Sequence, residues 1–393
     1  MKRGRKILLI GLGALGYPTL EILSRTPTIT ESLDKIIAAD VRENKGTRKM
    51  NTALMTAEQL GYHPDLEFTK INLFDIDRTT EQLKSIDPDL IYAAVSLLTW
   101  WIPRYLPKKQ ADRITQAGIG SFLPMHLTLL YNLMRAIRKA GIDPLVVNAS
   151  IPDITAPTLK KAGLPYTVGI GNIGIVIPLL KWTVSKKLGI PMRDITVSMV
   201  APHFVAYALT RVGTTEGAPY FLKIIANSKD VTSKIDPDKS LARRNPGLPK
   251  LLGGIEINSL VATCSVSIIR GLIQNTQEII HAPGPNGLPG GYPIRVGRKG
   301  VEVVLPEELT LEEAVLINEE AQKFDGIEEI KDDGTVVFTE KSRNIMKEEL
   351  GYDCRPFKPH ESEKRARELG ACFKAFGEKW GLPDFALKAI WSG

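Results

Sequence analysis

A glycine-rich turn near the N-terminus constrains the fold of this 393-residue chain more than any other feature. The segment GLGALG at 11–16 follows a short apolar run at 6–10 and precedes an apolar, helix-like stretch that ends near Leu23. It is a G-x-G-x-x-G motif between a strand and a helix, which is the context that the motif requires. The first glycine permits the tight turn, the second lets the backbone approach a pyrophosphate, and the third lets the helix pack closely on the strand. An anionic group would then lie at the helix N-terminus, where free N–H groups and the helix dipole favour negative charge. The residues expected to contact a dinucleotide here are Gly11, Gly13, Ala14, Leu15 and Gly16.

An acidic residue at the end of the second apolar run supports this interpretation. The run at 36–40 ends in Asp40, whose carboxylate can accept hydrogen bonds from an adenosine ribose, so the sequence favours NAD. A glycine-rich turn with a surface aspartate is the simpler alternative. Four basic residues follow closely and can accommodate a 2′-phosphate, so the sequence leaves NADP open: Arg42, Lys45, Arg48 and Lys49.

Strand-like and helix-like segments alternate through the first 150 residues. The pattern predicts further strands at 67–73, 89–96 and 144–149, and helices at 52–61, 79–86 and 123–140. Such alternation is typical of an α/β fold with a doubly wound parallel sheet of the Rossmann type. Ligands of these sheets lie beyond the carboxyl ends of the strands. We therefore expect the segments Ser96–Trp101 and Asn148–Asp153 to line the site, with Ser96 on the cofactor side.

Two adjacent tryptophans stand in the first of these loops. Trp100 and Trp101 predict an aromatic wall or lid for a substrate, although packing in a core or an interface explains them equally well. Arg104 can reach a substrate anion from the same loop, and His126, near the start of the helix at 123–140, can face the cleft. Each of the two also has a plain interpretation, as a surface arginine and as a core or surface histidine.

Composition excludes several classes of protein. The 51 basic and 44 acidic residues leave a net charge of +7, spread along the chain rather than gathered on one tail, so we expect no nucleic-acid partner. The three cysteines form no CxxC motif, which predicts a reducing compartment and no structural metal. Glycines interrupt the apolar N-terminal run, and no stretch has the ~18 uninterrupted apolar residues of a membrane span. The sequence therefore predicts a cytoplasmic protein without a membrane partner.

Motifs in the second half carry a family resemblance. The segment GYPIRVGRKGVE at 291–302 precedes a capping box of Thr310 and Glu313, and VNASIPD at 147–153 and VGIG at 168–171 lie upstream. A strand at 195–200 is followed by His203. Over residues 7–325 the chain resembles the lactate/malate dehydrogenase superfamily. The resemblance implies a mixed α/β catalytic domain, an NAD cofactor, a small-molecule substrate and a homodimer or homotetramer. It also implies that His203 is the catalytic acid–base and that Asn148 lies near the nicotinamide ribose.

Two departures from the family pattern bear on the substrate. Ile175 stands where the family has the aspartate that orients the histidine, and Pro178 stands where it has the arginine that binds the substrate carboxylate. An apolar position cannot clamp a carboxylate as a bidentate arginine does. We therefore expect a substrate other than a standard 2-hydroxy acid. Asp153 and Asn172 are the candidates for a new partner of His203, and Arg104 or Arg211 could supply the missing cation.

The sequence thus predicts a dinucleotide-binding domain at 1–150, a catalytic domain at 151–338 and a helical C-terminal extension at 339–393. The favoured function is an NAD(P)-dependent oxidoreductase that uses His203, with Asp153 and Asn172 beside it. Two alternatives stay open. One is a hydrolase or epimerase that uses bound NAD for transient oxidation, and the other is a nucleotide-sensing protein without catalysis.

Overall fold

A parallel sheet forms the first half of the protein, as the alternating pattern predicts. The structure is a computed structural model, and it describes residues 5–241, 245, 247–251 and 254–393. The six strands run in the order β3-β2-β1-β4-β5-β6. Their bounds are β1 Lys6–Ile10, β2 Lys35–Asp40, β3 Leu66–Lys70, β4 Leu90–Ala93, β5 Leu145–Asn148 and β6 Val168–Gly169. The order reverses between β1 and β4, and a doubly wound sheet binds its ligand at such a point.

Helices connect these strands. They are α1 Gly16–Ser24, α2 Pro27–Thr30, α3 Glu43–Glu58, α4 Ile76–Ile86, α5 Lys108–Thr115, α6 Leu123–Ala140 and α7 Pro152–Lys161. The prediction for α6 is confirmed at both ends. Helix α3 begins nine residues before the predicted start at 52, because its first turns are polar and hide the helical period. The residues on its buried face are Gly46, Met50, Ala53 and Ala57, and their spacing of three or four residues is helical.

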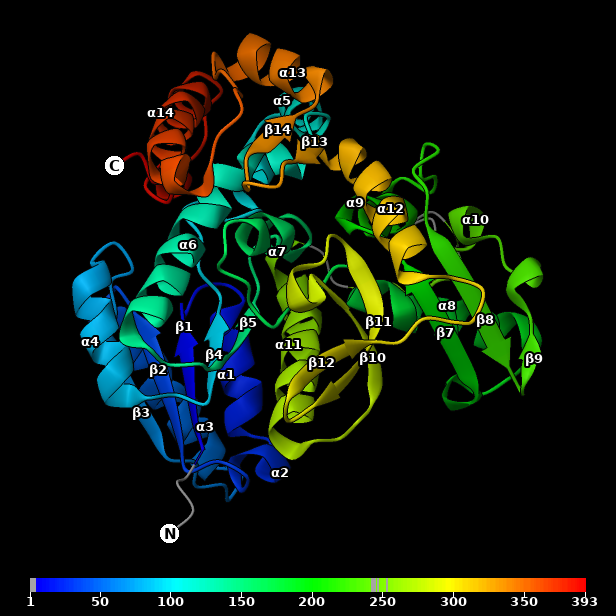
Figure 1. The fold of residues 1–393 in the computed structure, drawn as a ribbon, viewed down its shortest axis with the longest axis horizontal. Coiled ribbons are helices and arrows are strands. Elements are labelled where there is room, and N and C mark those ends of the chain that lie inside the picture. Colours follow the sequence, from blue (N-terminus) through cyan, green and yellow to red (C-terminus); the bar gives the residue numbers. More distant parts are fainter. Residues whose placement is uncertain (1–4, 242–244, 246, 252–253) are drawn as a thin grey trace.

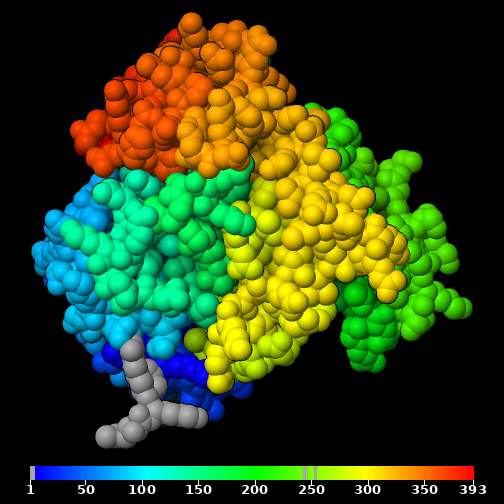
Figure 2. Space-filling view, viewed as in Figure 1, coloured from blue at the N-terminus to red at the C-terminus, as the bar shows by residue number. Residues whose placement is uncertain are grey.

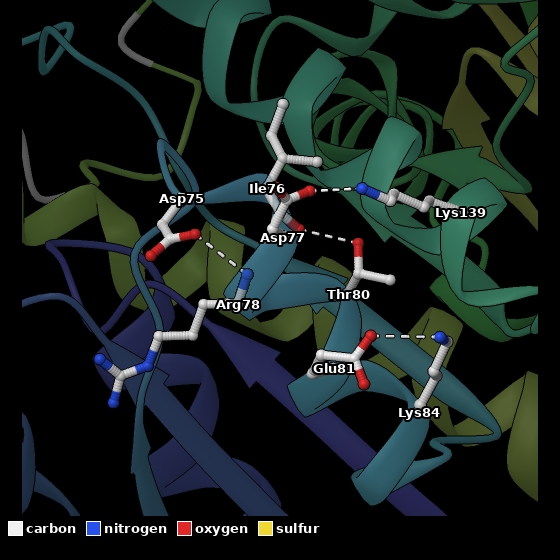
Figure 3. A network of polar contacts seen from close by, with 8 residues as sticks. All are labelled: Asp75, Ile76, Asp77, Arg78, Thr80, Glu81, Lys84 and Lys139. Atoms are coloured by element: carbon white, nitrogen blue, oxygen red, sulfur yellow. Dashed lines mark hydrogen bonds and ion pairs between the residues drawn. The ribbon is translucent and has the colours of Figure 1, made fainter.

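Polar contacts fix the start of α4 and join it to α6 (Figure 3). Asp75 caps the helix by accepting a hydrogen bond from the backbone N–H of Arg78 at 3.0 Å. Asp77 forms an ion pair with Lys139 of α6. Exposed ion pairs contribute about 0–1 kcal/mol each, so burial of Thr79, Thr80 and Leu83 matters more for this helix.

The second half is built on two small antiparallel sheets (Figure 1). One holds β7 Ile195–Val200, β8 Phe221–Ala226 and β9 Lys229–Asp230, and the other holds β10 Ile279–Pro283, β11 Gly291–Gly297 and β12 Gly300–Val303. A bridge between Ala201 and Gly291 joins the two. The surrounding helices are α8 Ile173–Leu188, α9 His203–Arg211, α10 Pro237–Leu241, α11 Asn258–Gln274 and α12 Leu311–Gln322. The predicted capping box of Thr310 and Glu313 starts α12.

The C-terminal region from residue 327 packs on the first half of the chain. It contains β13 Ile327–Ile330 and β14 Val336–Phe338, which precede the predicted boundary at 338, and α13 Glu340–Leu350, α14 Ser362–Lys379 and α15 Asp384–Leu387, which lie in the predicted extension. Figures 1 and 2 show it in orange and red above α6. Phe373 of α14 meets Phe122 edge-on at 5.6 Å between ring centres, within one hydrophobic core that both regions share. The division at 338 and 339 stays a prediction.

The last residues of the chain reach the strand-end loops of the parallel sheet. The backbone N–H of Trp391 donates to the Leu97 carbonyl at 3.3 Å, and its ring stacks on Phe74 at 5.2 Å. Leu97 follows β4 and Phe74 follows β3. The extension therefore bears directly on the edge of the sheet where a ligand is expected.

One described helix passes the length and composition test for a membrane span. It covers Ile255–Gln274, with a mean hydropathy of 1.3. Helix α11, which forms most of it, packs against α1, α8 and β11. Such packing is typical of the core helix of a globular protein, and α11 has that place in this fold.

Candidate active site

The glycine-rich turn has a shape that only glycine permits at two positions. Gly11 has φ +93°, and a Cβ atom there would lie 2.4 Å from the Ala94 carbonyl oxygen. A Cβ atom on Gly16 would lie 1.8 Å from the carbonyl oxygen of Gly11, so the helix could not approach the strand. No atom lies within 4 Å of the place where Gly13 would carry its Cβ. Gly13 therefore keeps an open approach to the backbone at the start of α1.

The surroundings of this turn fit a dinucleotide. Helix α1 begins without a side-chain cap, although Tyr17 and Thr19 of its first turn donate their N–H groups to the carbonyls of Gly13 and Leu15 at 3.3 and 3.1 Å. A pyrophosphate would therefore approach the turn that precedes the helix. Asp40 is buried at the end of β2, and its carboxylate accepts hydrogen bonds from the N–H groups of Leu12 and Arg42, each at 2.9 Å. Lys49 donates to the Leu12 carbonyl oxygen at 2.6 Å. Hydrogen bonds thus hold the Asp40 carboxylate and the glycine turn together, next to the open space above Gly13.

A histidine–aspartate pair forms the centre of the other end of the site. His203 is the first residue of α9, and its Nδ1 lies 2.7 Å from Oδ1 of Asp325. The second oxygen of Asp325 accepts the backbone N–H of Phe204 at 2.8 Å. Asp325 is 1% exposed, whereas the side chain of His203 is 22% exposed. One carboxylate therefore caps α9 and orients the imidazole, which leaves Nε2 for other chemistry.

Close backbone packing places Asp325. It ends the short helix η7 Lys323–Asp325 that follows α12, and Gly326 after it has φ +93°. Cβ atoms on Gly118 and Gly120 would lie 2.3 Å and 2.7 Å from the Asp325 carbonyl oxygen. The segment before α6 thus packs directly against the backbone of the residue that holds His203.

A second carboxyl lies near the same histidine. Asp153, in the first turn of α7, is fully buried, and its Oδ2 accepts a hydrogen bond from the side-chain amide of Asn172. Its Oδ1 has no hydrogen-bond partner among the described residues. Its backbone carbonyl accepts from Gln322 of α12 at 2.8 Å. The carboxyl group is therefore firmly placed, yet half of its hydrogen-bonding capacity is unused.

The backbone on both sides of Asp153 is strained. Ile151 has φ 40° and ψ 58°, which is unfavourable for a β-branched residue that precedes a proline. Asn172, at the start of α8, has φ 48° and ψ −108°. Residues held in such conformations cost about 1–3 kcal/mol each and gather at functional sites. The strain lies at the ends of β5 and β6, next to the His203 region.

Electrostatic effects shift the pKa values of both acid–base groups. Burial alone would lower the pKa of His203, but the charge of Asp325 and its hydrogen bond, with a smaller effect of Asp153, raise it. Burial raises the pKa of Asp153 to about 6; the charge of His203 opposes this shift and that of Asp325 adds to it. Perturbed values of this kind are typical of functional sites.

Known proteins of two related activities resemble this chain. No family model matches the sequence. The malate dehydrogenase of Parabacteroides distasonis is 21% identical over 335 residues, which cover 80% of this chain and 94% of the relative. That of Citrifermentans bemidjiense is 22% identical and covers 80% and 95%. Among solved structures, the lactate dehydrogenase of Cryptosporidium parvum, complexed with lactic acid and NAD, aligns with a TM-score of 0.55 and 16% identity over 83% of this chain and 98% of that one. The malate dehydrogenase of Plasmodium falciparum aligns with a TM-score of 0.52 and 16% identity over 87% and 99%.

The chain thus resembles malate dehydrogenases in sequence and shares the fold of lactate and malate dehydrogenases. The relatives match about 80% of this chain and almost their own full length. This likeness agrees with the resemblance drawn from the motifs at 147–153, 168–171 and 291–302.

The structure holds His203 in a way that differs from our expectation. We expected Asp153 or Asn172 as the partner of His203, but the hydrogen bond goes to Asp325, 122 positions away. Asn172 binds Asp153 instead, and Asp153 acts on His203 through its charge. Sequence reasoning missed Asp325. The one local signal is that it ends a helical segment directly before Gly326, and this signal does not indicate a functional residue. No spacing links that position to His203.

The other residues predicted on the cofactor side occupy different surroundings. The fully buried Asn148 donates to the Ser150 carbonyl and to the hydroxyls of Thr155 and Tyr166 at 3.0–3.1 Å. Its side chain thus braces the loop after β5. Ser96 is exposed and donates to the Leu98 carbonyl at 3.1 Å. As cofactor contacts, both stay predictions.

His126 is buried beside that loop. Its Nδ1 lies 3.0 Å from the hydroxyl of Ser150, and burial lowers its pKa to about 4, so the imidazole is neutral at physiological pH. This pair joins α6 to the loop after β5. A role of His126 toward substrate stays a prediction.

Trp101 has a neighbour in the C-terminal extension, and Trp100 has one in its own loop. Trp101 lies 5.6 Å from Tyr105 and 6.4 Å from Phe385, measured between ring centres. Arg104 stacks over Trp100 at 4.3 Å. The loop after β4 is thus held by aromatic contacts, and its contact with substrate stays a prediction. No cluster of three or more His, Cys, Asp or Glu side chains among the described residues could hold a metal.

Proposed function

We propose that this protein is an NAD-dependent dehydrogenase that moves a hydride between nicotinamide and the carbinol carbon of a small substrate other than a simple 2-hydroxy acid. The observation that carries this proposal is the His203–Asp325 pair in a chain whose glycine turn and Asp40 fit a dinucleotide. Bound NAD would supply the hydride acceptor. All other steps belong to side chains of this chain.

His203 is the proton carrier in this proposal. Asp325 accepts the Nδ1–H of the imidazole, so the neutral ring has its lone pair on Nε2. Nε2 takes the proton of the substrate hydroxyl as the hydride leaves the same carbinol, and it returns that proton in the reverse reaction. Asp325 stabilises the imidazolium that forms, as a buried carboxylate does in other histidine–aspartate pairs.

We propose NAD rather than NADP as the preferred cofactor. A 2′-phosphate beside the ribose would meet the carboxylate of Asp40, which is fixed by Leu12 and Arg42. The guanidinium of Arg42 is itself paired with Asp40 at 3.3 Å. Like charges at hydrogen-bonding distance are costly, so Asp40 disfavours the extra phosphate.

Ligand-induced stabilisation tests the proposal directly. Saturating NAD should raise the melting temperature, because a ligand that binds only the native state stabilises it, and NADP should raise it less. Stabilisation by NAD with NADH formation from a secondary alcohol supports the dehydrogenase. Failure of both nucleotides to shift the melting temperature would contradict it. Substrate turnover without net NADH would support transient oxidation, and His203→Ala without consequence would support a nucleotide sensor.

We further propose a cytoplasmic homodimer or homotetramer that acts on a small molecule, in line with the superfamily. Light scattering coupled to size-exclusion chromatography would give the mass in solution. A monomer at micromolar concentration would overturn the oligomer.

A further inference from the structure

The charges around His203 differ from those of a carboxylate-binding site. Two carboxyl groups act on the imidazole: Asp325 through a hydrogen bond and Asp153 through its charge. Arg211 is a cation that also acts on His203, and its guanidinium stacks over the ring of Tyr207 at 5.3 Å. Negative charge thus predominates among the groups that face this histidine.

The first two turns of the helix that begins beside Asp153 add no positive charge. The first eight residues of α8, at 173–180, read IGIVIPLL and contain no charged side chain. The positions at which the superfamily pattern has an aspartate and an arginine are Ile175 and Pro178. A carboxylate bound beside α8 would find neither an arginine fork nor a lysine on its first two turns.

The unused oxygen of Asp153 defines what this site can recognise. Oδ2 of Asp153 is satisfied by Asn172, and Oδ1 is buried without a partner among the described residues. A buried carboxyl oxygen without a hydrogen bond is unfavourable, so a ligand that donates one is favoured there. A hydroxyl or an ammonium group donates such a bond, whereas a carboxylate cannot and would add like charge.

We infer that the substrate of this site carries a hydrogen-bond donor, a hydroxyl or an ammonium group, on the carbon next to the reacting carbinol, and that Asp153 binds this donor. The inference rests on the proposed dehydrogenase function. In the reaction R–CH(OH)–CH2X + NAD⁺ → R–CO–CH2X + NADH + H⁺, the carbinol C–H bond breaks and its electron pair leaves with the hydride. The O–H proton passes to Nε2 of His203 and then to solvent. The group X, a hydroxyl or an ammonium, keeps its bonds throughout and donates to Oδ1 of Asp153.

Four small alcohols test the inference, because they share a C2 carbinol and differ at C1. The probes are propane-1,2-diol, 1-aminopropan-2-ol, lactate and butan-2-ol. For each we would measure kcat/KM from NADH formation, and binding from the quenching of NADH fluorescence in the enzyme–NADH complex. We expect the diol or the amino alcohol to exceed both lactate and butan-2-ol by about 10- to 100-fold in kcat/KM, as expected when a buried charged hydrogen bond is made or lost. Preference between the two donors identifies hydroxyl or ammonium.

Asp153→Asn separates recognition from a purely structural role. The amide keeps the shape and can still accept the Asn172 hydrogen bond, so the variant should fold, with NAD binding unchanged. The ratio of kcat/KM for the amino alcohol to that for butan-2-ol should fall at least tenfold. Asp153→Glu should restore part of the preference. A structural role would lower all four rates together and leave their ratios intact.

Several outcomes would overturn the inference without touching the proposed function. Lactate oxidised as fast as the diol would point to Arg211 as a carboxylate clamp, and Arg211→Gln would then abolish that activity. Stabilisation by NAD together with no binding or turnover of either donor probe would also contradict it. The proposed function fails separately, when NAD itself does not bind.

Discussion

The two ends of the candidate site are built in opposite ways. The cofactor end is assembled from neighbours in sequence: the turn at 11–16, Asp40 and Lys49 all lie within the first fifty residues. The substrate end joins His203 to Asp325 across 122 positions and adds Asp153 from a third segment. The turn at 11–16 matches the general dinucleotide-binding motif, whereas Ile175 and Pro178 stand where the resemblance to lactate and malate dehydrogenases predicts an aspartate and an arginine. A dinucleotide that many enzymes use requires one fixed backbone geometry at its binding turn. The residues around His203 can differ between proteins as long as one of them keeps the imidazole oriented.

The largest expected effect comes from the proton carrier itself. His203→Ala should lower kcat about 1000-fold, within the range that acid–base groups contribute, while the Kd for NAD stays within twofold. The assay is NADH formation with the best of the four alcohols, alongside NAD titration by fluorescence. If His203→Ala weakened NAD binding as strongly as it lowered kcat, His203 would act on cofactor binding as well as on proton transfer.

Removal of the carboxylate that orients the imidazole should cost less. Asp325→Asn should reduce kcat about 100-fold, the lower end of acid–base contributions. Because Asp325 raises the pKa of His203 and burial lowers it, the acid limb of the kcat/KM profile for alcohol oxidation should move to lower pH in the variant.

Asp332→Asn is the matched control, since Asp332 is exposed, lies seven residues after Asp325 and forms an ion pair with Lys161 at 3.9 Å. Its profile should follow that of the wild type. If the acid limb of the kcat/KM profile of Asp325→Asn stays at the pH of the wild type, Asp325 is not the residue that positions His203.

Two glycines of the turn should respond differently to the same substitution. In Gly16→Ala the new methyl group meets a backbone oxygen 1.8 Å away, so the free energy of unfolding should fall by about 1–3 kcal/mol. In Gly13→Ala nothing lies within 4 Å, so stability should hold while the Kd for NAD rises about tenfold, equivalent to ~1.4 kcal/mol. Chemical denaturation and NAD titration of both variants check this. Gly13→Ala with full NAD affinity would place the pyrophosphate elsewhere.

The smallest effect concerns stability against pH at the substrate end. The pKa of Asp153 is raised to about 6 in the folded protein, so the native state holds a proton that the unfolded chain has already lost between pH 4 and 6. The stability that this proton confers is complete below pH 4 and is lost as the pH rises through 6. Between pH 4 and pH 8, the free energy of unfolding of Asp153→Asn should therefore rise by roughly 1–2 kcal/mol relative to that of the wild type. Each unit of pKa shift corresponds to ~1.4 kcal/mol, and relaxation of the protein around the charged carboxylate reduces this value. Melting temperatures at both pH values test the sign, and a constant difference would contradict it.

Local patterns predicted most of the fold, and their failures have physical causes. Strands β1 and β7 and helix α6 begin and end where the apolar periods predict, because burial against one sheet face imposes those periods. Helix α3 begins earlier than predicted because its first turns lie at the surface, where no apolar period is required. The tryptophan loop was ambiguous for a related reason: its aromatic partner Phe385 belongs to a helix of four residues near the end of the chain.

The sequence by itself determined the parallel sheet with its glycine turn, the resemblance to lactate and malate dehydrogenases and the place of His203 directly after β7, because each depends on residues whose spacing is set by one turn, one helix or one strand. It also predicted that Ile175 and Pro178 stand where that resemblance has charged residues. Only the tertiary structure decided that Asp325 holds the imidazole and that Asp153 keeps an unpaired oxygen beside it. A hydrogen bond between distant segments depends on how the whole chain packs. Here it depends on the contact of Gly118 and Gly120 with the backbone of Asp325, and no spacing in the sequence records such a contact.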